Sequence, residues 1–343
     1  MSMMNLVANS PNTPPYPWLV ADIGGSNARF GWVDQPDGDV RYVQTLTVAE
    51  FASPIEASQR YLQQLQTQLG DAYSAPRCAA FAVATAVGQD QISFTNSHWS
   101  FSQANVKTAL ELDTFITLND FEALALSLPR LKPHQIRAHA GSPEPRGCMC
   151  VIGPGTGLGV GSVMQTRHGW VAIPGEGGHA SLAATDAFEA EVLAQVRQEY
   201  HHVSAERVLS GIGLPALYRG VAKVMQAEAL DLSTEAIVER GLRAHLDLAH
   251  PDSVCTQTLE TFCALLGSFA GSVALIVGAR GGVYIGGGIV PRLGDFFFQS
   301  RFREKFEAKG RLRGYLAHIP SALITDTLAA LSGAALAIEQ SED

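Results

Sequence analysis

The spacing of hydrophobic and polar positions changes at one short segment, residues 115–129. Its first four residues form an apolar run with β-branched side chains, which is typical of a strand. From Phe121 the apolar residues recur at helical spacing, until Pro129 ends the pattern. The pattern therefore predicts a strand that delivers Asn119 and Asp120 to the start of a helix. Such residues suit a helix cap, and they also suit a ligand site, because open α/β sheets bind ligands at the carboxyl ends of their strands.

A second pattern occurs twice: an apolar strand, a glycine-rich turn and another strand. Its first copy covers residues 18–33, and its second covers residues 150–164, where glycines recur at every second position from Gly153. Each copy opens one half of the chain. We therefore expect a duplicated α/β architecture, with two sheet-and-helix lobes and one hairpin from each facing a shared cleft.

The rest of the chain reads as alternating strands and helices. Further strands are expected at residues 40–47, 78–86, 92–100, 281–290 and 323–325. Helices are expected at residues 54–69, 187–200, 204–209, 214–229, 234–248, 253–277, 302–309 and 327–339. Residues 131–147 are polar and contain several prolines and histidines, which predicts a loop that crosses between the lobes.

Length and composition narrow the class of protein. A chain of 343 residues with 46% hydrophobic residues suggests two folded domains and excludes a largely disordered chain. The net charge of −9, without a basic cluster, argues against nucleic acid or an anionic membrane as a partner. Residues 1–17 have the composition of a loose arm and lack the pattern of a signal peptide. The best candidate for a membrane span, residues 274–290, is broken by Arg280 and by glycines. We expect a cytoplasmic protein.

The five cysteines form no regular framework. An odd number of cysteines without such a framework indicates free thiols in a reducing compartment. Cys148-Met149-Cys150 resembles one half of a metal knuckle, but no second Cys/His cluster completes it. Thiols within a strand are the preferred interpretation.

The glycine turns are candidate phosphate sites, because backbone N–H groups in such turns can converge on phosphate oxygens. Two common nucleotide motifs do not fit. The chain has no Gly-Lys-Ser/Thr triplet, which a Walker A loop needs, and the glycines after Gly153 are followed by strand-like sequence where a dinucleotide fingerprint needs a helix. Two matching hairpins and a third turn, Gly286-Gly287-Gly288, nevertheless point to a nucleotide.

Several polar residues beside these turns suit phosphoryl transfer. Asp22 comes two residues before Gly24 and could hold Mg²⁺ through water, or bond its own turn. Asp120 is the best candidate for the base that accepts a hydroxyl proton. Glu176 and His179 could bind vicinal hydroxyls, and as a metal pair they would be too few. Glu206 reads more simply as a favourable charge in a first helical turn.

Seven motifs together carry a family resemblance. In the first part of the chain they are Asp22-Ile23-Gly24-Gly25-Ser26-Asn27-Ala28-Arg29, Thr95-Asn96-Ser97-His98-Trp99, Leu118-Asn119-Asp120-Phe121 and Gly153-Pro154-Gly155-Thr156-Gly157-Leu158-Gly159. In the second part they are Pro174-Gly175-Glu176-Gly177-Gly178-His179, Ser204-Ala205-Glu206-Arg207-Val208-Leu209-Ser210-Gly211 and Gly286-Gly287-Gly288-Ile289-Val290-Pro291-Arg292. In order and spacing the chain resembles the ATP-dependent bacterial glucokinases, which belong to the hexokinase/actin-like superfamily.

The resemblance implies an actin-like ATPase fold (ribonuclease H-like) with two lobes. The small lobe would comprise residues 18–130 and about 322–343, and the large lobe residues 131–321. The reaction implied is transfer of the γ-phosphoryl of MgATP to the 6-hydroxyl of glucose, in a homodimer. The related repressor/kinase group carries a cysteine-rich zinc motif after its His loop. No such cysteines follow His179, so no structural zinc is expected.

The resemblance also implies residue roles. Asp120 would be the base. The sugar-binding residues would be Asn96, Asn119, Asp120, Glu176, His179 and Glu206. The resemblance therefore overturns the simpler interpretation of Glu206 as a charge in a first helical turn. The nucleotide-binding residues would be Asp22, Gly24, Gly25, Ser26, Asn27, Gly155, Thr156, Gly157, Gly286, Gly287 and Gly288.

Three alternatives remain at this stage. A kinase for fructose or mannose would differ only in a few hydroxyl contacts. A sugar-responsive regulator on the same fold would need a basic helix-turn-helix ahead of the first hairpin, and the residues before Asp22 are rich in Pro and Asn. A catalytically silent scaffold is disfavoured because Asp22, Asp120, Glu176 and His179 are all present.

Overall fold

The computed structural model describes residues 14–36, 39–94, 97–246 and 252–341. The chain divides into two compact units. The first takes the described residues up to Arg130, together with Thr166–Ala172 and the segment that begins at Thr327. The second takes Leu131–Gln165 and Ile173–Asp326.

A five-stranded mixed sheet forms the centre of the first unit. Its strands, in the order β3-β2-β1-β4-β7, are β3 (Arg41–Thr47), β2 (Asn27–Val33), β1 (Trp18–Ile23), β4 (Cys78–Val83) and β7 (Thr114–Asn119). Strands β1, β4 and β7 are parallel, while β2 is antiparallel to both of its neighbours. The carboxyl ends of β1 and β7 therefore reach the same edge of the sheet.

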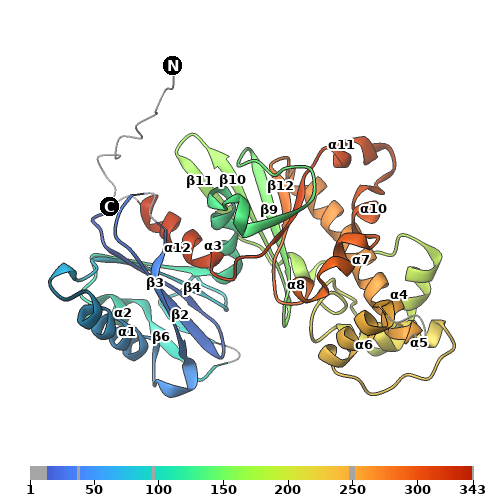
Figure 1. Cartoon of the computed structure of the whole chain (residues 1–343), viewed down its shortest axis with the longest axis horizontal. Helices are drawn as coiled ribbons and strands as arrows, with labels where there is room; N and C mark the ends of the chain where they lie inside the picture. The colour runs from blue at the N-terminus through green and yellow to red at the C-terminus, as the bar shows by residue number, and fades with distance from the viewer. Residues whose placement is uncertain (1–13, 37–38, 95–96, 247–251, 342–343) are drawn as a thin grey trace. The chain divides into compact units, whose positions relative to one another are not determined.

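Helices cover both faces of this sheet, with α1 (Pro54–Leu69) and α2 (Gln103–Ala109) on one side and α3 (Asp120–Ser127) and α12 (Ala329–Glu339) on the other (Figure 1). Alternate residues of β1 enter different cores: Leu19 packs in the core that α1 shares, and Val20 packs in the core that α12 shares. Burial on both faces explains why β1 is an unbroken apolar run up to Asp22. Ser53 caps α1 by accepting a hydrogen bond from the backbone N–H of Glu56.

The second sheet repeats this pattern. Its six strands, in the order β11-β10-β9-β12-β13-β8, are β11 (Gly169–Ile173), β10 (Leu158–Thr166), β9 (Cys148–Pro154), β12 (Gly282–Ile285), β13 (Ser321–Ile324) and β8 (Ile136–Ala140). An antiparallel hairpin, β9–β10, is again followed by parallel strands, β12 and β13. The predicted α/β class and duplicated mixed sheet are confirmed.

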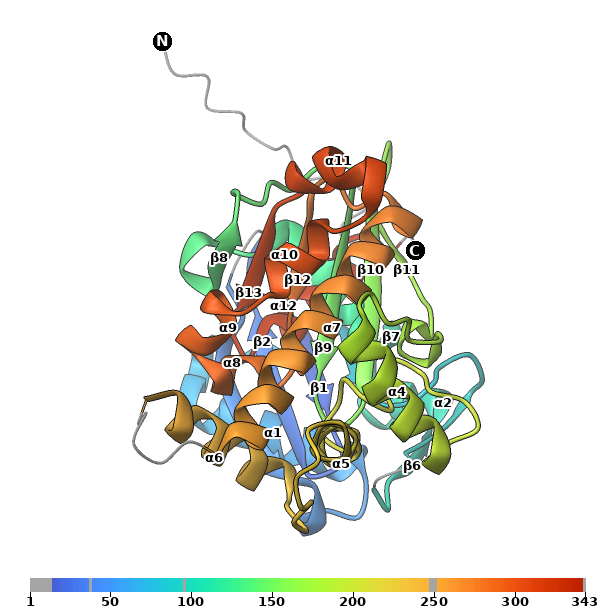
Figure 2. The ribbon, with the colours of Figure 1, turned by 90° about the vertical axis from the view of Figure 1, so that its right-hand side faces the viewer.

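Helices form the other layer of the second unit. They are α4 (Ala187–Glu199), α5 (Leu214–Val224), α6 (Thr234–Leu246), α7 (Ser253–Val277), α8 (Val290–Leu293), α9 (Asp295–Gln299), α10 (Phe302–Glu307) and α11 (Arg313–Ala317). Figure 2 shows α7 as the longest of them, with α4, α5 and α6 gathered near its amino-terminal half. Helix α7 is long and apolar enough to cross a membrane, but 72% of its most apolar window is buried inside the protein, which is typical of a core helix.

Four sequence-based assignments need correction. The strand expected at residues 92–100 is two short strands, β5 (Gln91–Ser93) and β6 (Ser100–Ser102), which pair with each other. The loop expected at 131–147 contains β8, which forms the sheet edge by pairing with β13. That pairing also places residues 322–326 in the second unit, and residues 166–172, assigned by sequence to the large lobe, group with the first.

The fourth correction concerns residues 204–209, which form bends and turns where a helix was expected. The amides of Ala205 and Glu206 donate to the carbonyls of Ala180 and Gly178. The amides of Val208 and Leu209 donate back to the carbonyl of Ala205, so only the first part of the segment bonds to the neighbouring glycine loop and to Ala180 just after it. All five cysteines are free thiols, and Cys148 and Cys150 lie in β9, as the strand interpretation predicted.

Helix α12 holds α3 through a very close backbone approach. A Cβ atom added to Gly333 would lie 1.7 Å from the carbonyl oxygen of Ala123. We expect Gly333→Ala to push α3 away and to lower the free energy of unfolding by about 1–3 kcal/mol or more. Chemical denaturation measures this loss. Ser332→Ala, at the adjacent position of α12, is the control and should change stability by less than about 0.5 kcal/mol; equal effects of the two variants would contradict the packing argument.

Candidate active site

The first glycine hairpin places Asp22 opposite a cation. Asp22 on β1 is the register partner of Arg29 on β2, and the Arg29 Nη1 lies 2.9 Å from the Asp22 Oδ2. The turn is closed by the N–H of Gly24, which donates to the carbonyl of Asn27 over 2.9 Å. Burial raises the pKa of Asp22, and the charge and hydrogen bond of Arg29 only partly oppose this. The predicted residues 24–27 thus lie directly beside a half-buried carboxylate.

Asn119 caps α3, and Asp120 is its first residue. The Asn119 Oδ1 accepts from the N–H of Phe121 at 3.0 Å, while its amide nitrogen donates to the carbonyl of Thr85 at 3.2 Å. Glu122 completes a capping box on the N–H of Asn119. The cap interpretation therefore holds for Asn119. It leaves Asp120 at the positive end of a helix, just beyond the carboxyl end of β7.

The Asp120 carboxylate has a strongly perturbed pKa. Desolvation by burial raises it to about 6, and the negative charge of Asp22 adds to the shift. Strand order explains this second cause, because β1 and β7 flank β4 and the register aligns Asp22 with Ala82 and Ala82 with Leu118. Two strand spacings, about 10 Å, therefore separate the rows that carry the two carboxylates. A pKa near the working pH is what a general base needs.

In the second unit, two glycine turns meet at one sheet edge. The hairpin turn at Gly155-Thr156-Gly157 is closed by the N–H of Gly155, which donates to the carbonyl of Gly157 at 2.9 Å. The turn at 286–288 follows β12, the parallel neighbour of β9. Gly287 has a φ of 76°, and a Cβ there would lie 2.3 Å from the carbonyl oxygen of Pro154, so only glycine fits. The structure thus brings these two predicted nucleotide elements together.

Glu206 lies against the same hairpin. Its Oε2 accepts a hydrogen bond from the N–H of Leu158 at 3.0 Å. A Cβ on Gly157 would lie 2.5 Å from that oxygen, so a side chain at Gly157 would displace the carboxylate. The N–H of Gly211 also donates to the carbonyl of Gly155 at 2.7 Å. The interpretation of Glu206 as a charge in a first helical turn is therefore wrong, because residues 204–209 form no helix and the Glu206 carboxylate binds the hairpin.

The glycine loop, residues 174–179, packs on the other side of Glu206. The backbone N–H of Glu206 donates to the carbonyl of Gly178 at 2.9 Å. A Cβ on Gly178 would lie 2.0 Å from the carbonyl oxygen of Leu158, which explains the glycine at this position. Glu176 and His179 are exposed and are linked by a short turn, with the N–H of His179 donating to the carbonyl of Glu176 at 3.0 Å. Three predicted sugar-binding residues thus share one neighbourhood.

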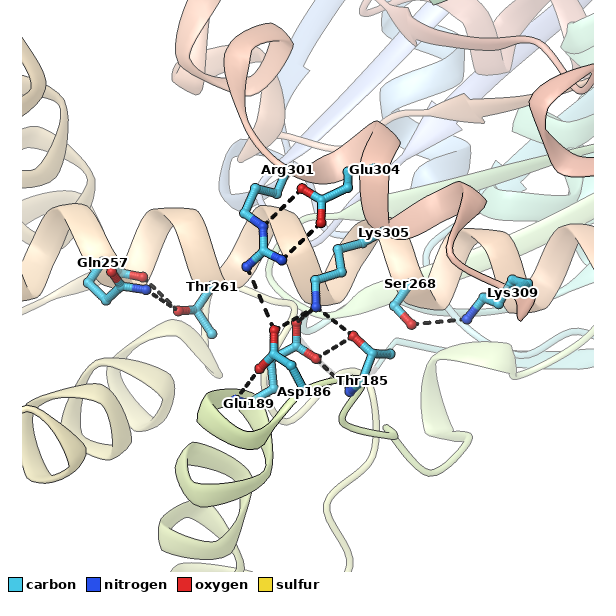
Figure 3. A network of polar contacts seen from close by, with 10 residues as sticks. All are labelled: Thr185, Asp186, Glu189, Gln257, Thr261, Ser268, Arg301, Glu304, Lys305 and Lys309. Atoms are coloured by element: carbon cyan, nitrogen blue, oxygen red, sulfur yellow. Dashed lines mark hydrogen bonds and ion pairs between the residues drawn. The ribbon is translucent and has the colours of Figure 1, made fainter. Parts of the chain in front are cut away.

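A buried ion network anchors the chain just after this loop (Figure 3). The Lys305 ammonium donates to the Thr185 hydroxyl at 2.8 Å and to Asp186 at 2.6 Å. It also forms an ion pair with the Glu189 Oε1 at 2.9 Å. The other Glu189 oxygen accepts from the N–H of Thr185 at 2.6 Å. Burial lowers the pKa of Lys305, but its carboxylate partners more than offset this and leave it raised.

The predicted site residues therefore fall into two groups, one in each unit. The first unit brings together Asp22, Gly24, Gly25, Ser26, Asn27, Asn119 and Asp120 at one sheet edge. The second brings together Gly155, Thr156, Gly157, Glu176, His179, Glu206, Gly286, Gly287 and Gly288. Asn96 lies outside the described residues. Within the part of the chain that is described, no cluster of three or more His, Cys, Asp or Glu side chains forms a metal site.

Sequence reasoning missed three supporting residues. Arg29 could have been found by counting the register of the first hairpin, which sets it opposite Asp22. Thr85 and Lys305 could not, because Thr85 acts through its backbone carbonyl and Lys305 lies 120 positions from Thr185.

Comparisons with known proteins point to the same family as the motifs. The sequence profile of the glucokinase family, described as Glucokinase, matches residues 19–341. The chain belongs to the glucokinase family. A glucokinase of Aromatoleum aromaticum is 44% identical over 94% of this chain and 95% of its own length. A glucokinase of Chromobacterium violaceum is 44% identical over 93% of this chain and 88% of its own length.

A solved structure shows the same fold. The crystal structure of a glucokinase from an Antarctic psychrotroph superposes with a TM-score of 0.87 at 36% identity, and it covers 95% of this chain and 99% of that one. The resemblance read from the motifs is therefore confirmed, and with it the predicted activity of an ATP-dependent hexose kinase that phosphorylates glucose.

Removing the Lys305 cation tests how much the buried ion network stabilises the chain that follows the glycine loop. Lys305→Met leaves the buried Glu189 carboxylate without its counter-ion, and we expect a loss of about 3–5 kcal/mol in the free energy of unfolding. Denaturant titration measures it. Arg301→Met is the control, because that side chain is 49% exposed and its removal should cost less than about 1 kcal/mol. A Lys305→Met variant as stable as the control would show that the network contributes little.

Proposed function

We propose that the chain transfers the γ-phosphoryl of MgATP to the 6-hydroxyl of glucose, with Asp120 as the general base. The single observation that carries this assignment is the Asp120 carboxylate, whose pKa burial and Asp22 raise to about 6. At neutral pH such a group is ionised, yet it is more basic than an ordinary aspartate. It is thus suited to accept the hydroxyl proton as the new P–O bond forms and the bond to the β-phosphate oxygen breaks.

The glycine turns would hold the phosphates. We assign Gly24, Gly25, Ser26 and Asn27 of the first unit, and Gly155, Thr156 and Gly157 of the second, to contacts with the triphosphate. In support, both turns leave backbone N–H groups beside glycines, where no Cβ keeps a phosphate away. Residues Gly286, Gly287 and Gly288 would bind the adenosine side, since that turn adjoins the second hairpin.

Magnesium fits the residues of the first unit. Asp22 offers carboxylate oxygens at a sheet edge, and Asp120 adds negative charge nearby. Mg²⁺ prefers oxygen ligands and keeps several waters, so one carboxylate is enough to hold it together with a nucleotide. We assign Asp22 to this role, through water. When bound, the ion would neutralise charge on the phosphates, and the Asp22–Arg29 pair would have to open or share the carboxylate.

The sugar hydroxyls would be bound by Asn119, Asp120, Glu176, His179 and Glu206. Asn119 spends one amide N–H on Thr85, so its second N–H would serve a sugar hydroxyl. Glu206 spends one oxygen on the hairpin, which leaves the other for the sugar. Asn96, outside the described residues, is kept as a further proposed sugar contact. We also propose a cytoplasmic homodimer; the five free thiols agree with a reducing compartment.

Removal of the proposed base should separate catalysis from binding. We expect Asp120→Asn to lower kcat by at least about a hundredfold while glucose affinity changes only a few-fold. In the parent enzyme kcat/KM should fall about tenfold per pH unit below about pH 6, because the protonated carboxylic acid cannot accept a proton. A coupled assay of ADP release over a pH series measures both.

Unfolding provides the control for this variant. The pKa of Asp120 in the folded state is raised above its usual value, so above about pH 6 its charge destabilises the fold. Asp120→Asn should therefore be at least as stable as the parent at pH 8. A stable variant with near-normal turnover would remove Asp120 from the role of base.

Loss of the proposed sugar contact in the glycine loop should act on KM. We expect Glu176→Gln to raise the KM for glucose about tenfold or more with a smaller change in kcat, because a carboxylate accepts stronger hydrogen bonds than an amide. Glu191→Gln, also exposed but on α4, is the matched control and should leave both constants unchanged. An unchanged KM in Glu176→Gln would show that the loop does not contact the sugar.

A further inference from the structure

A cavity of about 340 Å³ lies between the glycine loop and the carboxyl-terminal half of α7. Most of its walls are apolar. Phe269, Val273 and Ile276 line it from one face of α7, and Val160 and Leu182 line it from the opposite side. Its volume lies within the range of sites that bind small organic molecules. None of the residues proposed to bind glucose or ATP lines this cavity.

One cation lines this otherwise apolar cavity. The Lys309 ammonium donates to the hydroxyls of Ser268 and Ser272, each at 3.0 Å, and all three residues line the cavity. Among the described residues no carboxylate forms an ion pair with Lys309, whereas Lys305, four residues earlier, has two. Figure 3 shows the contrast: Lys305 points into the carboxylates of the network, and Lys309 extends toward Ser268.

The two hydroxyls compensate Lys309 only in part. Burial lowers the pKa of Lys309. Among the residues that the structure describes, the charge that opposes this shift is that of Glu189, which is already paired with Lys305. A partly desolvated ammonium with neutral partners gains most from an added anion. The apolar walls around it would at the same time bury a hydrocarbon group.

We propose that this cavity binds a small amphipathic carboxylate, with its apolar body against α7 and its carboxylate on Lys309, Ser268 and Ser272. The ammonium and the Ser268 hydroxyl would donate to the anionic group, and the Ser272 hydroxyl, which donates to the carbonyl of Ser268 at 3.1 Å, would add a third hydrogen bond by turning from that carbonyl to the ligand. A neutral molecule of the same shape would bury the same apolar surface but would leave the charge of Lys309 uncompensated.

Such a ligand would also act on the sugar site, because Pro174, Gly175 and Gly177 of the glycine loop form part of the cavity wall. This second statement rests on the proposed sugar-binding role of Glu176 and His179. A ligand in the cavity then changes the affinity for glucose, and by linkage glucose changes the affinity for the ligand by the same factor.

Calorimetric titration of the full chain with octanoate tests the binding site. We expect one octanoate per chain, and binding at least about tenfold weaker for octanamide, its neutral isostere. Lys309→Met should weaken octanoate binding by a similar factor and should leave octanamide binding unchanged. The matched control is Lys223→Met, an exposed lysine on α5, which should bind octanoate as the parent does.

Several outcomes would overturn the proposal. Octanoate that binds equally well to the Lys309→Met variant, or octanamide that binds as tightly as octanoate, would rule out the ammonium as the anchor. If Lys309→Met does not fold, Ala183→Trp, which fills the cavity from its exposed side, must abolish octanoate binding. Another outcome is a parent protein that is a dimer, that does not bind octanoate and that Ile276→Asp converts to a monomer. That result would show that a second copy of the chain covers the cavity.

The coupling has its own readout. The dissociation constant of glucose, measured by calorimetry with and without saturating octanoate, should differ in the parent and not in Lys309→Met. An unchanged value in the parent would overturn the coupling alone. Glucose that fails to bind, with octanoate binding still dependent on Lys309, would instead refute the proposed sugar site and leave the carboxylate site standing.

Discussion

Burial of the parallel strands on both faces is the constraint on which this structure depends. In β1, β4, β9 and β12 almost every side chain enters one core or another. Such strands have no exposed face on which polar chemistry could be placed. Polar groups are therefore confined to the strand ends, and the parallel arrangement brings those ends to one edge. The glycine turns, the Asp22 carboxylate and the Asn119-Asp120 pair all follow from that restriction.

The same burial sets the electrostatics of the first unit. Asp22 and Asp120 are both removed from water, and the negative charge of Asp22 further disfavours the charged form of Asp120. Arg29 is held by the hairpin register beside Asp22 and not beside Asp120. Both carboxylates keep a raised pKa, but only Asp22 has a counter-ion beside it within the unit. A single strand pairing therefore gives a cationic partner to one of two aspartates in similar positions.

Local patterns of the sequence were enough for the strongly periodic elements. Helix α1 was predicted with its observed bounds because Ser53 and Pro54 mark its start, and α7 because its apolar pattern is long. The segment 204–209 was predicted wrongly, since its backbone bonds go to Ala180 and Gly178, which are distant in sequence.

In the candidate site, too, the sequence revealed some residues and not others. Glycine turns and Asp120 were visible as motifs, and family resemblance supplied Glu206, whose isolated pattern favours a simple surface charge. The partners that hold these groups were not visible. A backbone carbonyl such as that of Thr85 carries no residue-type signal, and the pairing of Lys305 with Glu189 needs the fold itself.

The Lys305–Glu189 pair gives the second unit an unusual response to heat. Hydration of an ammonium and a carboxylate becomes less favourable as temperature rises, so the cost of keeping both ions out of water decreases. Hydrophobic contacts gain no comparable advantage over the same range. The anchor beside Thr185 is therefore a part of the unit whose relative contribution to stability grows on warming.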